Sequence, residues 1–243
     1  MSELYKTEQP AHVGWAEDEI ARSVNYRRLA KTAAGEPEMI KTASGSSVVK
    51  RVDANDAARA QKAGVVELTM LPRTGFRGNA TAEWLAGQEY PIPVRPNLAA
   101  ACAEGNWVLR LSQREYWLLA NPNDLGKAIS ELPTSMTETP AGCYPLFCMD
   151  SHAWLMLTGE HVGEVLSKLS AVDMREQHFP LGSIAQTSIA RVNAVMVRQQ
   201  INGLPAISIL CDVASSDYLW TVLMDAVQEF DGGAVGIDVL RSA

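Results

Sequence analysis

From Val65 onward, short apolar segments of strand length alternate with polar links, and this spacing constrains the fold more than any other feature of the chain. Apolar, β-branched and aromatic runs bounded by Gly, Pro, Asn and Ser predict strands, and two runs joined by a short polar link predict a hairpin. The predicted strands cover residues 65–71, 107–111, 115–120, 146–150, 154–158, 185–191, 194–198, 206–211 and 235–239. Hairpins outnumber strand–helix–strand units, which favours an α+β fold with antiparallel sheets and packed helices.

Helical periodicity predicts helices between these strands, over residues 54–63, 79–86, 123–132, 160–169 and 215–230. The last is the clearest, because apolar residues recur there at spacings of three and four. Its buried face is expected to include Leu223. We expect two related halves, and the Thr- and Pro-rich segment 133–142 predicts an internal boundary.

Residues 1–60 are predicted to form an extended N-terminal arm and linker, and residues 61–243 the α+β body. The arm holds nine Lys and Arg and nine Asp and Glu, so the body supplies the whole net charge of -7. A helix over 16–31 has acidic residues at its start and basic residues at its end, which suits the helix dipole. Its apolar face is too thin to fold alone. The segment 32–52, which contains several Gly and Ser residues, is interpreted as a linker.

Three aromatic side chains of this arm, Tyr5, Trp15 and Tyr26, are of the type that anchors protein–protein contacts. We therefore expect the arm to wrap a neighbouring subunit and to add little to the fold of the body.

The charge and hydropathy of the chain exclude several classes of protein. A net charge of -7, with no cluster of Lys and Arg, argues against binding to nucleic acid. No run reaches the roughly 18 apolar residues of a membrane span, so no membrane is expected. The first residues lack the apolar core of a signal peptide, which predicts a cytoplasmic protein.

The sequence offers weak candidates for chemistry, and we expect no catalytic, cofactor-binding or metal-binding residues in this chain. The four histidines lack the close pairing of zinc ligands, and the four cysteines form no Cys-x-x-Cys pair. Asp150, Ser151 and His152 are the residue types of a hydrolase triad, but neighbours on an extended segment point to opposite faces.

The segment 73–78 combines two arginines, two glycines and an aromatic ring. It could hold an anion against backbone amides, although a structural turn is the simpler interpretation. Neither of the nucleotide-binding motifs Gly-x-Gly-x-x-Gly and Gly-x-x-x-x-Gly-Lys-Ser/Thr occurs. Four tryptophans fall within predicted strands or helices and are expected in the core: Trp107, Trp117, Trp154 and Trp220.

Several segments occur in an order that is familiar from one family. They are LPRTGFRG at 71–78, AEWL at 82–85, VLRLSQREYWLL at 108–119, MDSH at 149–152, LTG at 157–159, VL at 165–166, DM at 173–174, FPLG at 179–182, AQTSIAR at 185–191 and SSDYLW at 215–220. Together they resemble the gamma subunit of heterotetrameric sarcosine oxidase. That subunit is similar to the aminomethyltransferase (glycine-cleavage T-protein) folate-binding superfamily. The resemblance covers residues 65–230, and residues 1–60 have no counterpart in it.

The resemblance implies a gamma chain without a cofactor, packed against alpha, beta and delta subunits. The complex oxidatively demethylates sarcosine or a related N-methylated amine, and FAD, FMN, NAD, tetrahydrofolate and zinc are expected in the partner subunits. No counterpart of the acidic catalytic residue of the transferases is present, so the resemblance implies the fold and not the methylene transfer.

Two alternatives stay open. One is a free-standing folate-binding protein, for which Asp150 and Asp173 are the best carboxylates, since a folate site usually includes a carboxylate facing the pterin. The other is the equivalent subunit of a related amine oxidase or dehydrogenase.

Overall fold

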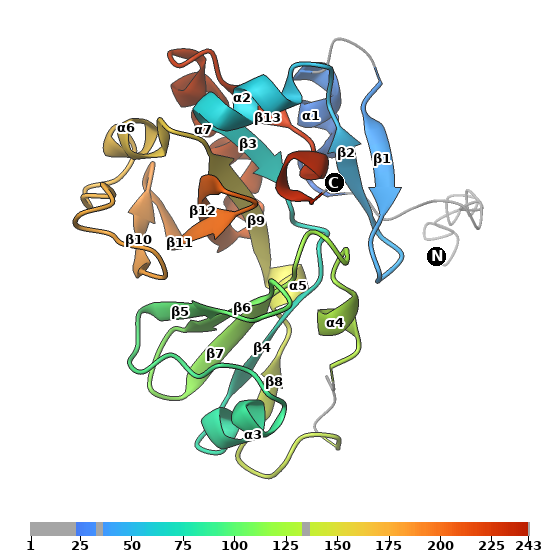
Figure 1. Cartoon of the computed structure of the whole chain (residues 1–243), viewed down its shortest axis with the longest axis vertical. Helices are drawn as coiled ribbons and strands as arrows, with labels where there is room; N and C mark the ends of the chain where they lie inside the picture. Colours follow the sequence, from blue (N-terminus) through green and yellow to red (C-terminus); the bar gives the residue numbers. More distant parts are fainter. Residues whose placement is uncertain (1–22, 33–35, 133–136, 243) are drawn as a thin grey trace, which may run out of the picture.

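The computed structural model describes residues 23–32, 36–132 and 137–242, which form two packed sheets and a peripheral hairpin (Figure 1). The larger sheet has six strands in the order β10-β11-β12-β9-β3-β13, and the smaller has five in the order β5-β6-β7-β4-β8. All pairings are antiparallel except that of β13 with β3. The predicted α+β class with antiparallel sheets is therefore confirmed.

The strands are β1 (Glu38–Lys41), β2 (Ser47–Arg51), β3 (Gly64–Glu67), β4 (Arg73–Arg77), β5 (Leu98–Ala101), β6 (Trp107–Arg110), β7 (Glu115–Leu119), β8 (Tyr144–Leu146), β9 (His152–Thr158), β10 (Ile184–Ile189), β11 (Val192–Ile201), β12 (Leu204–Asp212) and β13 (Gly233–Val235). The helices are α1 (Tyr26–Thr32), α2 (Asp56–Ala63), α3 (Thr81–Gly87), α4 (Lys127–Ser130), α5 (Cys148–Ser151), α6 (Val162–Ser167) and α7 (Ser216–Gln228), with short 3₁₀ turns at Val213–Ser215 and Ile237–Leu240.

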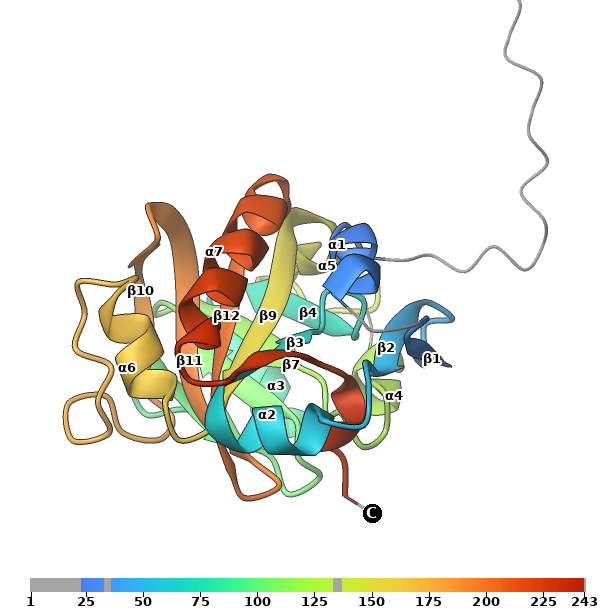
Figure 2. The ribbon, with the colours of Figure 1, turned by 90° about the horizontal axis from the view of Figure 1, so that it is seen from above.

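The six-stranded sheet separates two hydrophobic cores because its side chains alternate between its faces. On β9, Leu155 and Leu157 pack in a core with α6 and α7, whereas Trp154 and Met156 pack in a core shared with the five-stranded sheet. Figures 1 and 2 show α6 and α7 over one face of the larger sheet, and Figure 1 shows the smaller sheet beyond the other face. A sheet buried on both faces accounts for the nearly continuous apolar sequence of β9.

Helix α7 follows the prediction closely and has Leu219, Leu223 and Val227 on its buried side. The four tryptophans expected in the core are all buried, with at most 6% of their surface exposed. Strand β9 is followed by Gly159, whose φ of +105° favours glycine. A Cβ there would lie 2.3 Å from the Lys62 carbonyl oxygen.

The described part of the segment interpreted as a linker, residues 36–52, is structured, which corrects the prediction for these residues. It forms the β1–β2 hairpin, and Val48, Val49 and Val52 are buried in the two cores. Helix α2 contributes Ala60 and Ala63 to the same cores. The compact body therefore extends before the boundary expected at residue 61.

The end of the predicted 16–31 helix is α1, and it belongs to the body too. Leu29 is buried, Asn25 Nδ2 donates to Ser216 Oγ at 2.6 Å, and Arg28 forms a two-pronged ion pair with Asp217 at 2.6 and 2.8 Å. These contacts hold α1 against the start of α7. The helix is therefore stabilised by packing on another element, as expected from its thin apolar face.

Three further predictions need correction. Residues 146–150 form the end of β8 and the helical turn α5 instead of a strand, and the helix expected over 123–132 shortens to α4. The strand predicted over residues 235–239 is also corrected, because β13 ends at Val235 and a 3₁₀ turn follows at Ile237–Leu240.

The predicted boundary at 133–142 does not coincide with a passage between sheets. This segment lies between α4 and β8, and the chain passes between the sheets at residues 68–72 and at α5.

Candidate functional site

A buried arginine ties together the two places where the chain passes between the sheets. Arg73 begins β4 and exposes 3% of its surface. Its Nη1 donates to the Thr69 carbonyl at 2.8 Å, and its Nη2 donates to the carbonyls of Met149, at 3.0 Å, and His152. Burial lowers the pKa of this guanidinium to about 10, so it stays charged at neutral pH.

A buried carboxylate lies near this arginine at the end of β3. Glu67 is 4% exposed, and its Oε1 accepts a hydrogen bond from the Thr69 backbone N–H at 3.2 Å. Its carboxyl also hydrogen-bonds to the Ser23 side chain, which brings the beginning of the described chain to the sheet. Burial raises the pKa of Glu67, and these hydrogen bonds and Arg73 only partly offset that effect.

Glu67→Gln is therefore expected to stabilise the protein near neutral pH, about pH 7. The folded-state pKa of Glu67 lies above the ordinary value of 4.5, so folding favours its protonated form. As pH rises from 4.5 through the raised pKa, the wild type should lose stability relative to the variant, and below 4.5 the difference should be smallest. Denaturant unfolding across this pH range measures the difference.

The exposed Glu104→Gln serves as the matched control and should change the free energy of unfolding at pH 7 by less than about 0.5 kcal/mol. If the free energy of unfolding changes with pH in the same way for the wild type and for Glu67→Gln, this account of Glu67 is contradicted.

The Asp150–Ser151–His152 segment is a helical turn leading into the start of β9. Ser151 Oγ and His152 Nδ1 lie 2.8 Å apart, and Ser151 Oγ also donates to the Phe147 carbonyl at 3.2 Å. Asp150 is exposed, and within the described part of the chain no hydrogen bond joins it to His152. The geometry is that of a Ser–His pair at a turn and does not assemble a triad.

His152 lies half-buried against Trp117, with the ring centroids 4.7 Å apart in an edge-to-face arrangement. Burial and the nearby Arg73 charge lower the pKa of the imidazole, so it is neutral at pH 7. It borders a polar cavity of about 350 Å³ lined by β10, β11 and β12. This cavity contains hydroxyl and amide groups, including Gln186 and Asn193, and no charged side chain.

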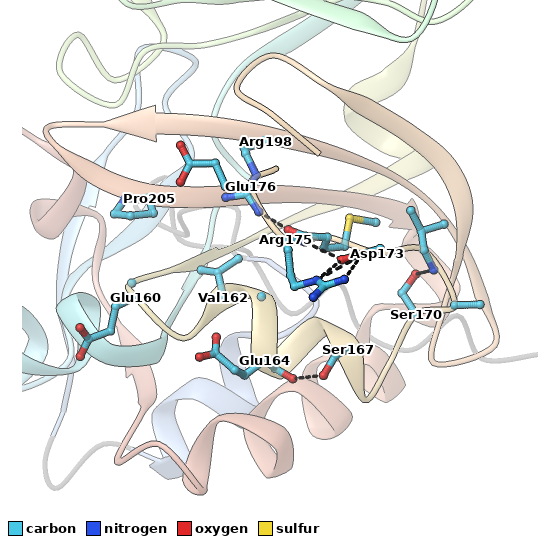
Figure 3. A pocket seen from close by; sticks show the side chains of 15 residues that line it. Glu160, Val162, Glu164, Ser167, Ser170, Asp173, Arg175, Glu176, Arg198 and Pro205 are labelled. Atoms are coloured by element: carbon cyan, nitrogen blue, oxygen red, sulfur yellow. Dashed lines mark hydrogen bonds and ion pairs between the residues drawn. The ribbon is translucent and has the colours of Figure 1, made fainter. Parts of the chain in front are cut away.

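A pocket of about 740 Å³ lies between α6, the loop 170–176 and the β11–β12 hairpin (Figure 3). Its walls include Ser167, Ser170, Arg175 and Arg198. Asp173, one of the two carboxylates considered for folate, is at this pocket but is paired with Arg175 at 2.6 Å. That ion pair holds the pKa of Asp173 far below its usual range, which suits an ionised structural carboxylate and not a proton donor.

A third cavity, of about 440 Å³, is mainly apolar and lies beside α4 and α5. Pro72, Ile129, Leu146 and Phe147 line it. Phe147 is 78% exposed and the neighbouring Tyr144 is 50% exposed, so the segment 144–147 presents apolar surface to solvent. We call the cavity and this segment the Phe147 face.

The structure places the other residues singled out from the sequence as follows. Tyr5 and Trp15 lie outside the described residues, and Tyr26 is half-buried at the start of α1. The segment 73–78 is mostly the buried strand β4, so neither the anion cradle nor the turn predicted there is correct.

Sequence reasoning missed the roles of Glu67, Arg198 and Phe147. A signal existed for Glu67, because it is a carboxylate inside an otherwise apolar predicted strand.

No group of three or more His, Cys, Asp or Glu side chains in residues 23–32, 36–132 and 137–242 is placed to bind a metal ion. Among the same residues, no helix is long and apolar enough to cross a membrane.

Solved structures with the same fold give the clearest comparison, since no family model and no curated protein matches the chain. A chain of the heterotetrameric sarcosine oxidase from Corynebacterium sp. U-96 aligns with a TM-score of 0.54 and 20% identity, over 74% of this chain and 94% of that one. The glycine cleavage system aminomethyltransferase T from Bartonella henselae aligns with a TM-score of 0.66 and 14% identity, over 90% of this chain and 60% of that one. At these identities the matches establish a T-protein-like fold.

Proposed function

We propose that this chain is a non-catalytic, gamma-type structural subunit of a heterotetrameric sarcosine oxidase-type complex. The observation that carries the proposal is the alignment with a chain of such an oxidase over 94% of that chain's length. The order of motifs from residue 71 to residue 220 supports the same relationship.

The proposed partners are the alpha, beta and delta subunits of the oxidase. In this proposal they hold FAD, FMN, NAD, tetrahydrofolate and zinc, and the complex oxidatively demethylates sarcosine or a related N-methylated amine. A cytoplasmic location agrees with the proposal. The equivalent subunit of a related amine oxidase or dehydrogenase would have the same fold, so the identity of the amine must come from the assembled complex.

A free-standing folate-binding aminomethyltransferase-like protein is the second candidate, and the higher TM-score of 0.66 with the aminomethyltransferase favours it. Three observations weigh against it. The chain spans 60% of that enzyme, Asp173 is neutralised by Arg175, and Asp150 is exposed on a turn. Both aspartates border a pocket, but Asp173 is held in its ion pair with Arg175 and Asp150 is exposed, so neither is placed as a free carboxylate facing a pterin.

The Phe147 face is the surface that best fits a partner subunit. An aromatic side chain that is 78% exposed beside an apolar cavity is costly in water and becomes favourable when a partner covers it. The arm residues Tyr5, Trp15 and Tyr26 are proposed as further contacts with the large subunit.

Phe147→Asp is expected to reduce co-purification with the alpha, beta and delta subunits by about tenfold or more, because it places a charge in an apolar contact. The variant should fold normally, since Phe147 is 78% exposed. The measurement is the amount of each partner retained by a tagged chain after co-expression.

Val94→Asp is the matched control, because Val94 is 86% exposed and does not border the apolar cavity. Equal retention by the two variants, together with assembly of the wild type, would reject the Phe147 face and leave the subunit proposal standing. Absence of assembly by the wild type would reject the subunit proposal itself.

A further inference from the structure

A buried arginine that forms no ion pair with the described residues lines the pocket of about 740 Å³. Arg198, on β11, is 7% exposed. Its Nη2 donates to the Met174 carbonyl, and its Nε has no hydrogen-bond partner. None of the ion pairs between described residues includes Arg198, and Glu176 acts on it only through space. A buried charge normally has a partner of opposite sign, because removing it from water costs several kcal/mol.

The carboxylates that line this pocket are already engaged or exposed to water, including Glu176, which is exposed and acts on Arg198 without forming an ion pair. Glu160 and Glu164 have 71% and 58% of their side chains exposed and lie 3.6 and 3.5 Å from the His161 ring nitrogens. Asp173 is held by Arg175, as Figure 3 shows. Arg198 is therefore the buried charged group of this pocket that has no ion-pair contact with the described residues, and an anionic ligand would supply one.

The shape and lining of the pocket also suit a small ligand. Its volume of about 740 Å³ falls within the range of small-molecule sites. The Ser170 hydroxyl accepts a hydrogen bond from the Val172 N–H and can donate its own proton to an anion, whereas the Ser167 hydroxyl already donates to the Glu164 carbonyl. Val162, Val172 and Pro205 provide apolar wall.

We propose that this pocket binds a small anion, with a carboxylate or phosphate group held by Arg198 and an apolar portion against Val162 and Val172. A guanidinium forms charge-assisted, often two-pronged hydrogen bonds with both groups. The inference does not depend on the proposed function, because a subunit of an oxidase and a free-standing protein could each carry such a site.

Calorimetric titration of the full chain with inorganic phosphate and with glutarate, at constant ionic strength, tests the proposal. Glutaramide, the neutral diamide of glutarate, is the control ligand. At least one anion should bind with a dissociation constant below about 10 mM, and glutaramide should bind about tenfold more weakly or not at all. Binding of phosphate alone would assign a phosphoryl ligand, and binding of glutarate alone a carboxylate ligand.

Two variants separate the pocket from the rest of the surface. Arg198→Met should weaken anion binding by about tenfold or more, whereas Arg114→Met, at an exposed arginine outside the pocket, should not change it. Gly163→Leu keeps Arg198 and narrows the pocket. A Cβ at Gly163 meets no atom within 4 Å, so the variant should fold.

Gly87→Leu is the matched control for Gly163→Leu, since Gly87 also lies in a helix with no atom within 4 Å of a Cβ, away from the pocket. Gly163→Leu should weaken binding and Gly87→Leu should not. Three results would overturn the site: no heat of binding at about 20 mM anion, equal binding of glutarate and glutaramide, or wild-type affinity in Gly163→Leu.

Discussion

Leu223→Ala is expected to lower the free energy of unfolding by about 2–5 kcal/mol. Leu223 is fully buried on the side of α7 that packs on the six-stranded sheet, in the core that also contains Leu155 and Leu157. Truncation removes apolar contacts and leaves a cavity that this close-packed core fills only in part. Chemical denaturation of the wild type and the variant gives the difference directly.

Asp225→Ala, at an exposed position of the same helix, is the control and should change the stability by less than about 0.5 kcal/mol. A loss below about 0.5 kcal/mol for Leu223→Ala would mean that α7 presents a different side to the sheet.

Arg73→Met is expected to lower the free energy of unfolding by about 2–4 kcal/mol. The change leaves the buried carbonyls of Thr69, Met149 and His152 without their common donor. It also removes the positive charge nearest the buried Glu67. Methionine has a similar length, so the loss reflects the hydrogen bonds and charge more than the packing.

Arg77→Met provides the control on the same strand, because the Arg77 side chain is 68% exposed and its nearest carboxylate lies 3.9 Å away. It should cost less than about 0.5 kcal/mol in the same denaturation experiment. If Arg73→Met is as stable as the wild type, Arg73 does not stabilise the two segments that connect the sheets, residues 68–72 and α5.

The spacing of apolar residues along the sequence correctly predicted those strands and helices in which that spacing is regular. The β6–β7 hairpin, β9 and α7 lie close to their expected bounds, because burial of one face or both leaves a clear period in the sequence. The hairpin within 32–52 was missed because Ser44, Gly45 and Ser46 belong to the turn between β1 and β2, and a short hairpin has little periodicity of its own. Helix α5 was missed because four residues are too few to show a helical period.

The candidate sites were less predictable than the fold. Arg198 is 24 residues from Met174, the carbonyl that it contacts, and Arg73 is 76 and 79 residues from two of its three acceptors. Such pairs are created by strand order, which a single sequence does not encode as a local pattern. The carboxylates singled out from motifs, Asp150 and Asp173, lie at a turn and in a local ion pair instead.

The most direct test of the subunit proposal is co-expression of the tagged chain with the alpha, beta and delta subunits, followed by measurement of native mass and absorbance. We expect one complex that contains all four chains and a bound flavin. The purified chain alone should show no flavin absorbance and no saturable binding of tetrahydrofolate in calorimetry. A chain that purifies alone while the other subunits assemble and oxidise sarcosine without it would contradict the proposal, as would tetrahydrofolate binding to the isolated chain that is lost in Asp173→Ala.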